Sequence, residues 1–398
     1  MYHEIQNTFS KHFQKSLVII PFGLIFVVNL LITQINGFEY AGKFAVFYGA
    51  SSFIAILFGM QWDIEVLVRE RRKLEFSIIF GILTVLCYLV IFSVFYILIS
   101  YLQTEYYLYL IIAASFIAIN EILFNGLIKT KKYQNWILIK SLSPIALLIL
   151  TINQVSLELT WLYAQVFPLS VLTILYLYNI DNFQFKNTLN HSPIFFQQLI
   201  KLVPITLSTL ISNSILLFCL IGITYKLGSF EAGIWVNAYR VFSLPIVLCG
   251  AIGLPFILST IGENTYVNKF KLFSKYLIFI FAIVILILPI IYIYGINIFQ
   301  VLTKSTYLMT GSFCLIIFLT GAAHSIIQNL RSFFQSINRT YIFLTILIIF
   351  IFFICSLFLS SSLYSFENIS NRIFYITLTT FFIINLYLIF LRYYDEPR

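Results

Sequence analysis

Charged residues are scarce in this chain of 398 residues: Asp, Glu, Lys and Arg make up 10% of it, against roughly 25% in ordinary soluble domains. The five cysteines all fall in apolar stretches without metal-ligand spacing, so we interpret them as small packing residues. There is no P-loop, H-E-x-x-H or G-x-S-x-G motif and no aspartate-rich pair. Long polar loops are also missing, which leaves no extramembrane domain for a soluble active site. We therefore expect neither an enzyme nor a cofactor or metal site.

What the chain has instead is a series of apolar stretches, each about as long as the ~20 residues that carry an α-helix across a bilayer. Hydrophobic residues make up 61% of the sequence, and the mean hydropathy is +0.97. In lipid the backbone must satisfy its own hydrogen bonds, so such stretches form helices. The predicted spans cover residues 17–35, 44–62, 76–101, 107–127, 135–153, 159–178, 198–224, 232–261, 273–295, 308–328, 341–362 and 373–393.

The positive charges predict the orientation of these twelve spans. Seventeen of the 24 lysines and arginines lie in the two termini and in every second loop, four lie in the other loops, and three lie inside spans. Loops rich in Lys and Arg stay in the cytoplasm, so both termini are expected there. The net charge of +9 is explained by this topology, and no nucleic-acid partner is expected.

The longest connection, residues 179–196, divides the chain into two predicted six-helix lobes, 1–178 and 197–398. Residues 41–59 and 232–250 are alike at a constant offset of 191, with six identities in 19 positions. Because each lobe has an even number of spans, both enter the membrane from the same side. The sequence thus predicts an all-α polytopic membrane protein with a parallel pseudo-twofold repeat around a central cavity.

The second copy of this repeat also carries a family resemblance. Residues 231–256 are similar to a G-x-x-x-x-A-x-R-x-x-x-L-P stretch of bacterial polysaccharide exporters. Residues 59–69 resemble the first-half pattern of the same family, but Gln61 replaces its arginine. The family is the multidrug/oligosaccharidyl-lipid/polysaccharide superfamily, in its O-antigen flippase (Wzx-type) branch. The matching residues of the second motif are Gly233, Ala238, Arg240, Leu244 and Pro245.

The resemblance implies that the protein carries an undecaprenyl-diphosphate-linked oligosaccharide from the inner to the outer leaflet of the bacterial cytoplasmic membrane. It implies membrane lipids as surroundings and a glycan polymerase complex as a partner. A multidrug or organic-cation antiporter of the same superfamily, a membrane glycan polymerase and a non-transporting scaffold remain alternatives.

Ionisable residues inside spans are the candidate site, because each costs at least ~2.5–3.5 kcal/mol without a partner or a wet cavity. Arg240 lies roughly 13 Å into its helix at 1.5 Å per residue, and a guanidinium binds phosphate oxygens in a bidentate manner. Its alternative role is a structural ion pair between the lobes. The predicted substrate-binding residues are Arg240, Lys201, Asn237, Trp235 and Tyr239, and the predicted hinge residues are Gly233 and Pro245.

Two further intramembrane charges, Glu121 and Lys140, lie at similar depths on consecutive antiparallel spans. We expect either a structural ion pair or, in the functional alternative, a protonation site at Glu121 for ion coupling. His324 is interpreted as a packed or interfacial histidine.

Overall fold

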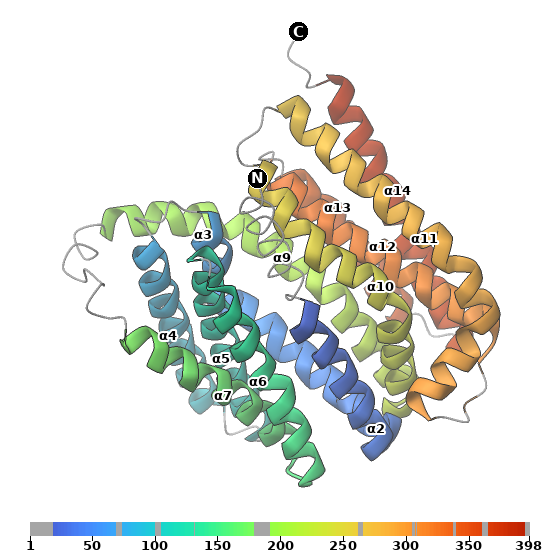
Figure 1. The fold of residues 1–398 in the computed structure, drawn as a ribbon, viewed down its shortest axis with the longest axis horizontal. Coiled ribbons are helices and arrows are strands. Elements are labelled where there is room, and N and C mark those ends of the chain that lie inside the picture. Colours follow the sequence, from blue (N-terminus) through green and yellow to red (C-terminus); the bar gives the residue numbers. More distant parts are fainter. Residues whose placement is uncertain are drawn as a thin grey trace, which may run out of the picture. The chain divides into compact units, whose positions relative to one another are not determined.

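The computed structural model describes residues 19–68, 74–99, 105–130, 132–178, 192–261, 266–304, 307, 309–336, 340–359 and 365–394. Within these residues the regular structure is entirely helical (Figure 1). The helices are α2 (Ile19–Gly59), α3 (Trp62–Val68), α4 (Leu74–Ile99), α5 (Glu105–Lys129), α6 (Tyr133–Ile152), α7 (Leu157–Tyr178), α9 (Ser192–Lys226), α10 (Ser229–Ile261), α11 (Tyr266–Thr303), α12 (Gly311–Ser336), α13 (Thr340–Leu359) and α14 (Phe366–Tyr394).

Each predicted span falls on one of the long helices. Nine helices of the described part are long and apolar enough to cross a membrane. The prediction of an all-α polytopic membrane protein is confirmed.

Helix α2 accounts for the first two predicted spans. Its 41 residues would extend about 62 Å as a straight helix, twice the ~30 Å of a hydrocarbon core. Gly37 interrupts it with φ 81° and ψ 175°, a conformation that glycine adopts without a Cβ clash. The exposed ion pair of Lys43 with Glu39 (2.7 Å) lies just after this break, where the sequence predicts a loop between spans 17–35 and 44–62.

The motif around Gln61 forms a sharp turn. Met60 and Gln61 adopt φ values of 41° and 58°, in the left-handed region that non-glycine residues rarely occupy, and so end α2. Helix α3 begins at the next residue, Trp62, which is fully buried. Asn125 on α5 donates a hydrogen bond of 3.0 Å to the backbone oxygen of Asp63. The turn therefore anchors a short helix against α5.

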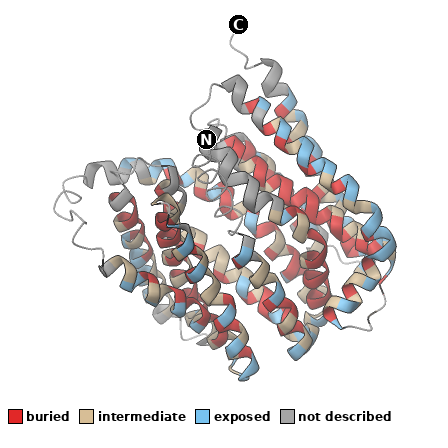
Figure 2. Ribbon diagram, in the orientation of Figure 1, coloured by how far each residue is buried: buried red, intermediate tan, exposed pale blue. Residues whose placement is uncertain are grey.

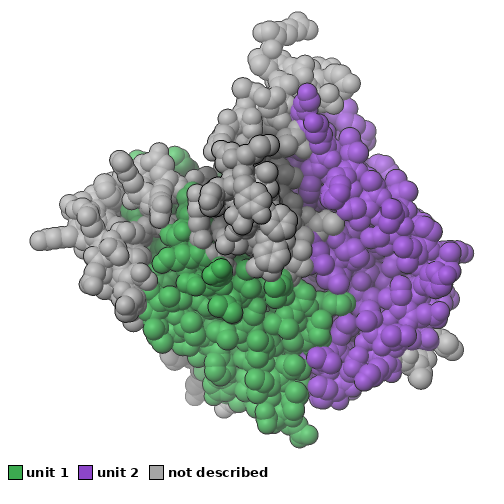
Figure 3. Space-filling model, in the orientation of Figure 1, with its two compact units in different colours: residues 1–29, 47–206 green, residues 30–46, 207–398 purple. Residues whose placement is uncertain are grey.

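The structure comprises two compact units (Figure 3). Unit 1 contains residues 1–29 and 47–206, and its core includes side chains of α3, α4, α5, α6 and α7 and of the end of α2. Buried side chains such as Trp62, Phe58 and Ile122 fill it. Unit 2 contains residues 30–46 and 207–398, and α12 lies at its centre because α10, α11, α13 and α14 all pack on it. Most of the described side chains of α12 are buried (Figure 2).

Residues 30–46 belong to unit 2 because they pack closely on α10. An ideal Cβ atom on Gly233 would lie 1.8 Å from the backbone oxygen of Phe38, and one on Gly42 would lie 2.0 Å from the backbone oxygen of Ser229. At the repeat offset of 191, Gly42 corresponds to Gly233 and Phe38 to Ser229. The two contacts are therefore reciprocal, as expected where a pseudo-twofold axis passes between two copies of one segment. We call this contact the glycine crossing.

The two units differ from the predicted lobes in two segments. Residues 30–46 join unit 2 through the glycine crossing, and residues 197–206 join unit 1 although α9 continues unbroken beyond them. Of the predicted linker 179–196, residues 179–191 lie outside the described part of the chain, and residues 192–196 begin α9.

Candidate functional site

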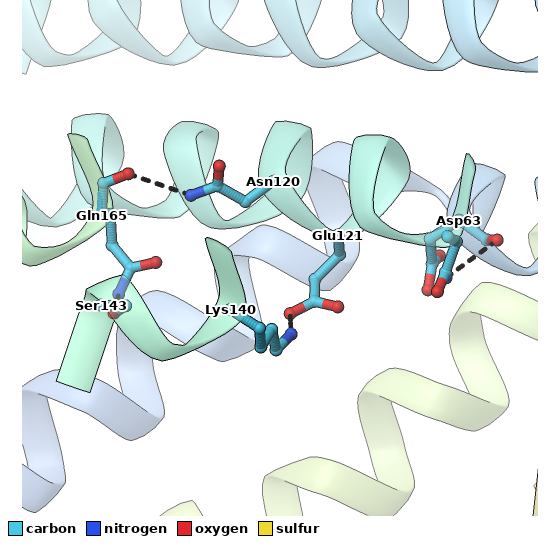
Figure 4. A network of polar contacts seen from close by, with 7 residues as sticks. Asp63, Asn120, Glu121, Lys140, Ser143 and Gln165 are labelled. Carbon is cyan, nitrogen blue, oxygen red and sulfur yellow. Dashed lines mark hydrogen bonds and ion pairs between the residues drawn. The ribbon is translucent and has the colours of Figure 1, made fainter. Parts of the chain in front are cut away.

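One polar centre lies in unit 1 and contains the ion pair between Lys140 of α6 and Glu121 of α5 (Figure 4). The ammonium group of Lys140 also lies 4.7 Å from the centroid of the Phe124 ring, in cation–π geometry. The lysine side chain is 16% exposed and the glutamate 43%. A largely covered cation thus pairs with a more exposed carboxylate on a membrane helix.

Amide groups beside this pair join three helices of unit 1. Asn120 donates a hydrogen bond of 3.0 Å to the backbone oxygen of Gln165 on α7, and Gln165 donates one of 3.1 Å to the hydroxyl of Ser143 on α6 (Figure 4). Asn120 and Gln165 are both buried. These bonds join α5, α6 and α7 to one another, and Asn120 directly precedes Glu121 on α5.

The predicted binding residue Asn237 is fully buried in unit 2. Its amide nitrogen donates to the backbone oxygen of Gly233 (2.8 Å), and its oxygen accepts a hydrogen bond from Thr33 (3.0 Å). The nitrogen of the amide is thus bonded within α10, and its oxygen joins α10 to residues 30–46, beside the glycine crossing. Asn237 acts in this structure as an internal connector.

Trp235 and Tyr239 are buried as well, at 1% and 8% exposure, and their rings stack at a centroid distance of 5.3 Å. The Tyr239 hydroxyl lies 2.8 Å from Nδ1 of His324 on α12. Stacking on a sugar needs an exposed ring face, which neither side chain offers in this conformation. Both rings serve to pack unit 2.

The predicted cations fall in different units. Arg240 is partly exposed on α10 in unit 2 and interacts with other groups of the chain. Lys201 is exposed near the start of α9, in unit 1. Each lies on a membrane helix. Their contact with a diphosphate stays a prediction.

The two predicted hinge residues lie on α10, which runs from Ser229 to Ile261 through both of them. Gly233 allows the close backbone contact of the glycine crossing. Pro245 is partly buried within the helix. A bend at either position remains a prediction.

A second polar centre, in unit 2, is one that the sequence reasoning missed. Arg331 donates a hydrogen bond of 2.9 Å to the hydroxyl of Ser212 on α9, and Gln328 donates one of 2.9 Å to the backbone oxygen of the same serine. His324 lies between Gln328 and Tyr239. The sequence does carry a signal for it, because His324, Gln328 and Arg331 follow the i, i+4, i+7 spacing of one helix face.

Comparison with known proteins identifies the fold. No protein-family model matches the sequence, and the search of curated proteins finds no match. Among solved structures, an inward-facing multidrug resistance MATE family transporter of the MOP superfamily superposes with a TM-score of 0.66 at 13% identity, over 96% of this chain and 100% of that one. A mutant of the Vibrio cholerae MATE transporter VcmN gives a TM-score of 0.59 at 14% identity, over 95% and 98%.

A third structure has the same fold and a different pocket. It is a MOP superfamily transporter from Pyrococcus furiosus, for which reverse polarity of the binding pocket is described as suggesting a different function. It superposes with a TM-score of 0.64 at 13% identity, over 94% of this chain and 95% of that one. At these identities the likeness is one of fold, and this chain has the fold of MATE transporters over nearly its whole length.

Proposed function

We propose that this chain is a secondary transporter that works by alternating access and exports an amphipathic organic cation in exchange for an inward-moving cation. The observation that carries the proposal is the superposition on MATE and other MOP superfamily transporters over 94–96% of the chain. A bacterial cytoplasmic membrane with both chain termini in the cytoplasm is part of the proposal, and it rests on the distribution of Lys and Arg.

Glu121 is the acid we assign to cation exchange. A carboxylate in contact with lipid is disfavoured by several kcal/mol, so a side chain that is 43% exposed on a membrane helix implies a water-filled path beside it. Lys140 neutralises the carboxylate while no cargo is bound. An incoming organic cation and a coupling ion each compete with Lys140 for the carboxylate oxygen atoms of Glu121. The cargo and the coupling ion therefore cannot be bound there at the same time.

The second candidate is the lipid-linked oligosaccharide flippase that the family resemblance implies. Arg240 and Lys201 favour it, because basic side chains on membrane helices suit a diphosphate. With the cell interior negative, each negative charge that moves outward is favoured by ~2.3 kcal/mol per 100 mV. The reverse pocket polarity described for the Pyrococcus furiosus protein supports the idea that this fold accommodates other cargo. A glycan polymerase complex and membrane lipids are the partners in this second candidate.

One experiment separates the two candidates. The purified protein is reconstituted in liposomes and tested with a fluorescent organic cation in one arm and with a short prenyl-diphosphate-linked sugar in the other. The matched variants are Glu121→Gln and Arg240→Ala. Transport of the dye that is lost in Glu121→Gln and kept in Arg240→Ala supports the antiporter, and the opposite pattern supports the flippase. Absence of transport in both arms, with the protein folded and correctly inserted, would refute both.

A further inference from the structure

The outer face of α11 takes no part in the polar centres described above. Among the candidate spans in the described part of the chain, Phe273–Thr303 of this helix is the most apolar and the least buried. On the inner face, the ring of Phe273 stacks on Phe333 of α12 at a centroid distance of 4.3 Å. The ring of Phe299 lies 6.4 Å from that of Phe242 on α10. The outer face is open and mainly apolar, so it contacts lipid (Figure 2).

Two lysines and a serine lie at one end of this open face. Lys271 and Lys275 are exposed and lie one helical turn apart, and Ser274 beside them is partly exposed. Positions i, i+3, i+4 and i+7 share one side of a helix. Ile278 follows Lys271 by seven residues and Ile285 follows Ile278 by seven, and they are 67% and 70% exposed. We call these five residues the α11 stripe.

Aromatic packing directs the two lysines away from the core of unit 2. The buried ring of Phe270 lies 5.0 Å from that of Phe333 on α12, and Phe273 stacks on the same ring from one turn further along. The apolar span begins at Phe273, so Lys275 lies inside it. The preference of lysine for cytoplasmic loops explains cations near this end of α11. It does not explain why they lie on the side of the helix that faces lipid.

The polar groups of the α11 stripe are not bonded within the described part of the chain. No ion pair or hydrogen bond there engages either ammonium group or the hydroxyl of Ser274. Other hydroxyls in the spans of unit 2, such as those of Thr224 and Thr303, donate to the backbone of their own helix. Two like charges one turn apart also repel each other. An anion between Lys271 and Lys275 would remove this repulsion and accept all three donors.

The chemistry of the α11 stripe selects the kind of anion. Ammonium and hydroxyl groups form charge-assisted or strong hydrogen bonds with phosphate oxygens. The exposed isoleucines continue the same face into the hydrocarbon region, where they suit an acyl chain. A phospholipid carries both parts in one molecule, and an anionic head group leaves the negative charge of its phosphate uncompensated. A free phosphate ion would make no use of the apolar half of the α11 stripe.

We propose that Lys271, Ser274 and Lys275 bind the phosphate of one anionic phospholipid, whose acyl chains lie along Ile278 and Ile285. The distribution of Lys and Arg assigns this end of α11 to the cytoplasm, so the lipid comes from the inner leaflet. By bridging the two lysines, the lipid stabilises the end of α11 that packs on α12. The site requires a membrane and no cargo, and it is independent of the function proposed above.

The first test counts lipids bound to the purified full-length protein by native mass spectrometry. Phosphatidylglycerol and phosphatidylcholine with identical acyl chains are offered in equal amounts. One lysine near an anionic lipid head group is worth about a fivefold change in binding, so we expect the first bound lipid to be phosphatidylglycerol by about 30-fold. Lys271→Gln and Lys275→Gln should each lower this preference about fivefold, and the double variant should abolish it.

The matched control is the double variant Lys132→Gln, Lys304→Gln, which removes two exposed lysines outside the α11 stripe. It changes the net charge equally and should keep the wild-type preference. The variant Lys271→Arg, Lys275→Arg keeps both charges and should keep it too. The same preference in the double glutamine variant and in this control would overturn the proposal. So would a wild-type protein that binds both lipids equally, because the lysines then extend to water.

The second test separates a lipid from other anions. The melting temperature in detergent is measured with phosphatidylglycerol, with phosphatidylcholine and with inorganic phosphate alone. We expect phosphatidylglycerol to raise the melting temperature of the wild type and of the control, and to leave the double glutamine variant at its phosphatidylcholine value. Equal stabilisation by inorganic phosphate, or by an acidic peptide in place of the lipid, would refute a phospholipid as the occupant.

Discussion

Replacement of Gly233 by alanine should push apart the glycine crossing. The new Cβ atom would lie 1.8 Å from the backbone oxygen of Phe38, whereas real Cβ contacts are not shorter than 3.0 Å, so the two segments must separate by about 1.2 Å. The obstacle is backbone, which cannot rotate away as a flexible side chain would. Overpacking of this kind costs typically ~1–3 kcal/mol, and we expect the upper end here.

Two glycines of α2 provide controls for Gly233 of α10. A Cβ atom on Gly59 would make an ordinary contact of 3.6 Å with Ala118, and one on Gly23 would meet nothing within 4 Å. Without a clash, an alanine in a helix is favoured over glycine by up to ~1 kcal/mol. The controls should therefore be neutral or stabilised, and Gly233→Ala should be destabilised by ~2 kcal/mol after the same gain is subtracted.

The assay is thermal unfolding of the purified protein in one detergent, with all variants measured side by side. A total difference of about 3 kcal/mol between Gly233→Ala and Gly59→Ala corresponds to a difference in melting temperature of roughly 4 °C for a chain of 398 residues that unfolds cooperatively. Gly42→Ala should behave like Gly233→Ala, and the double variant should cost less than the two together, because the first alanine already separates the segments. Equal melting temperatures for Gly233→Ala and Gly59→Ala would refute the reasoning.

The remaining predictions concern the polar residues. Asn237→Ala should destabilise unit 2 by about 1–3 kcal/mol, because it removes two buried hydrogen bonds; comparison of Asn237→Ala with Thr33→Val in thermal unfolding checks this. Lys140→Met should lower the apparent KM for a cationic dye, because the lysine no longer competes with the dye for the carboxylate of Glu121. Glu121→Gln should raise the KM, because it removes this carboxylate. An unchanged KM in both variants would count against Glu121 as the exchange site. Arg240→Ala should leave dye transport within about twofold and reduce transport of a diphosphate-linked sugar by tenfold or more, since a lost bidentate contact to phosphate is worth ~1.5–3 kcal/mol.

Most of the helices can be predicted from the sequence, because lipid permits few alternatives for an apolar stretch of 20 residues. The repeat is also visible there, and the reciprocal contacts of Gly42 and Gly233 fit it. The sequence does not reveal that residues 30–46 belong to unit 2, since this depends on how closely their backbone approaches that of α10. Hydropathy reports how apolar a segment is and carries no information about which neighbour it contacts.

The candidate site is less predictable, because a polar residue in a span looks the same in sequence whether it binds cargo or joins helices. Their positions near Arg240 on the same helix suggest Asn237 and Trp235 as contacts, and in this structure both side chains pack unit 2. The spacing of His324, Gln328 and Arg331 holds a usable signal that depth alone obscures. The predicted span boundary places Arg331 in a loop, although α12 continues to Ser336 and brings it against Ser212.

The two repeats agree in their framework and differ in their chemistry. Residues 30–46 and α10 meet symmetrically at the glycine crossing, while at corresponding positions α5 carries Asn120 and Glu121 and α12 carries His324 and Ser325. In the transporter that we propose, the different side chains of the two polar centres make the centres respond to different ions. It follows that substitutions in the crossing should impair every cargo alike, whereas substitutions in one polar centre should change which ion or cargo is favoured.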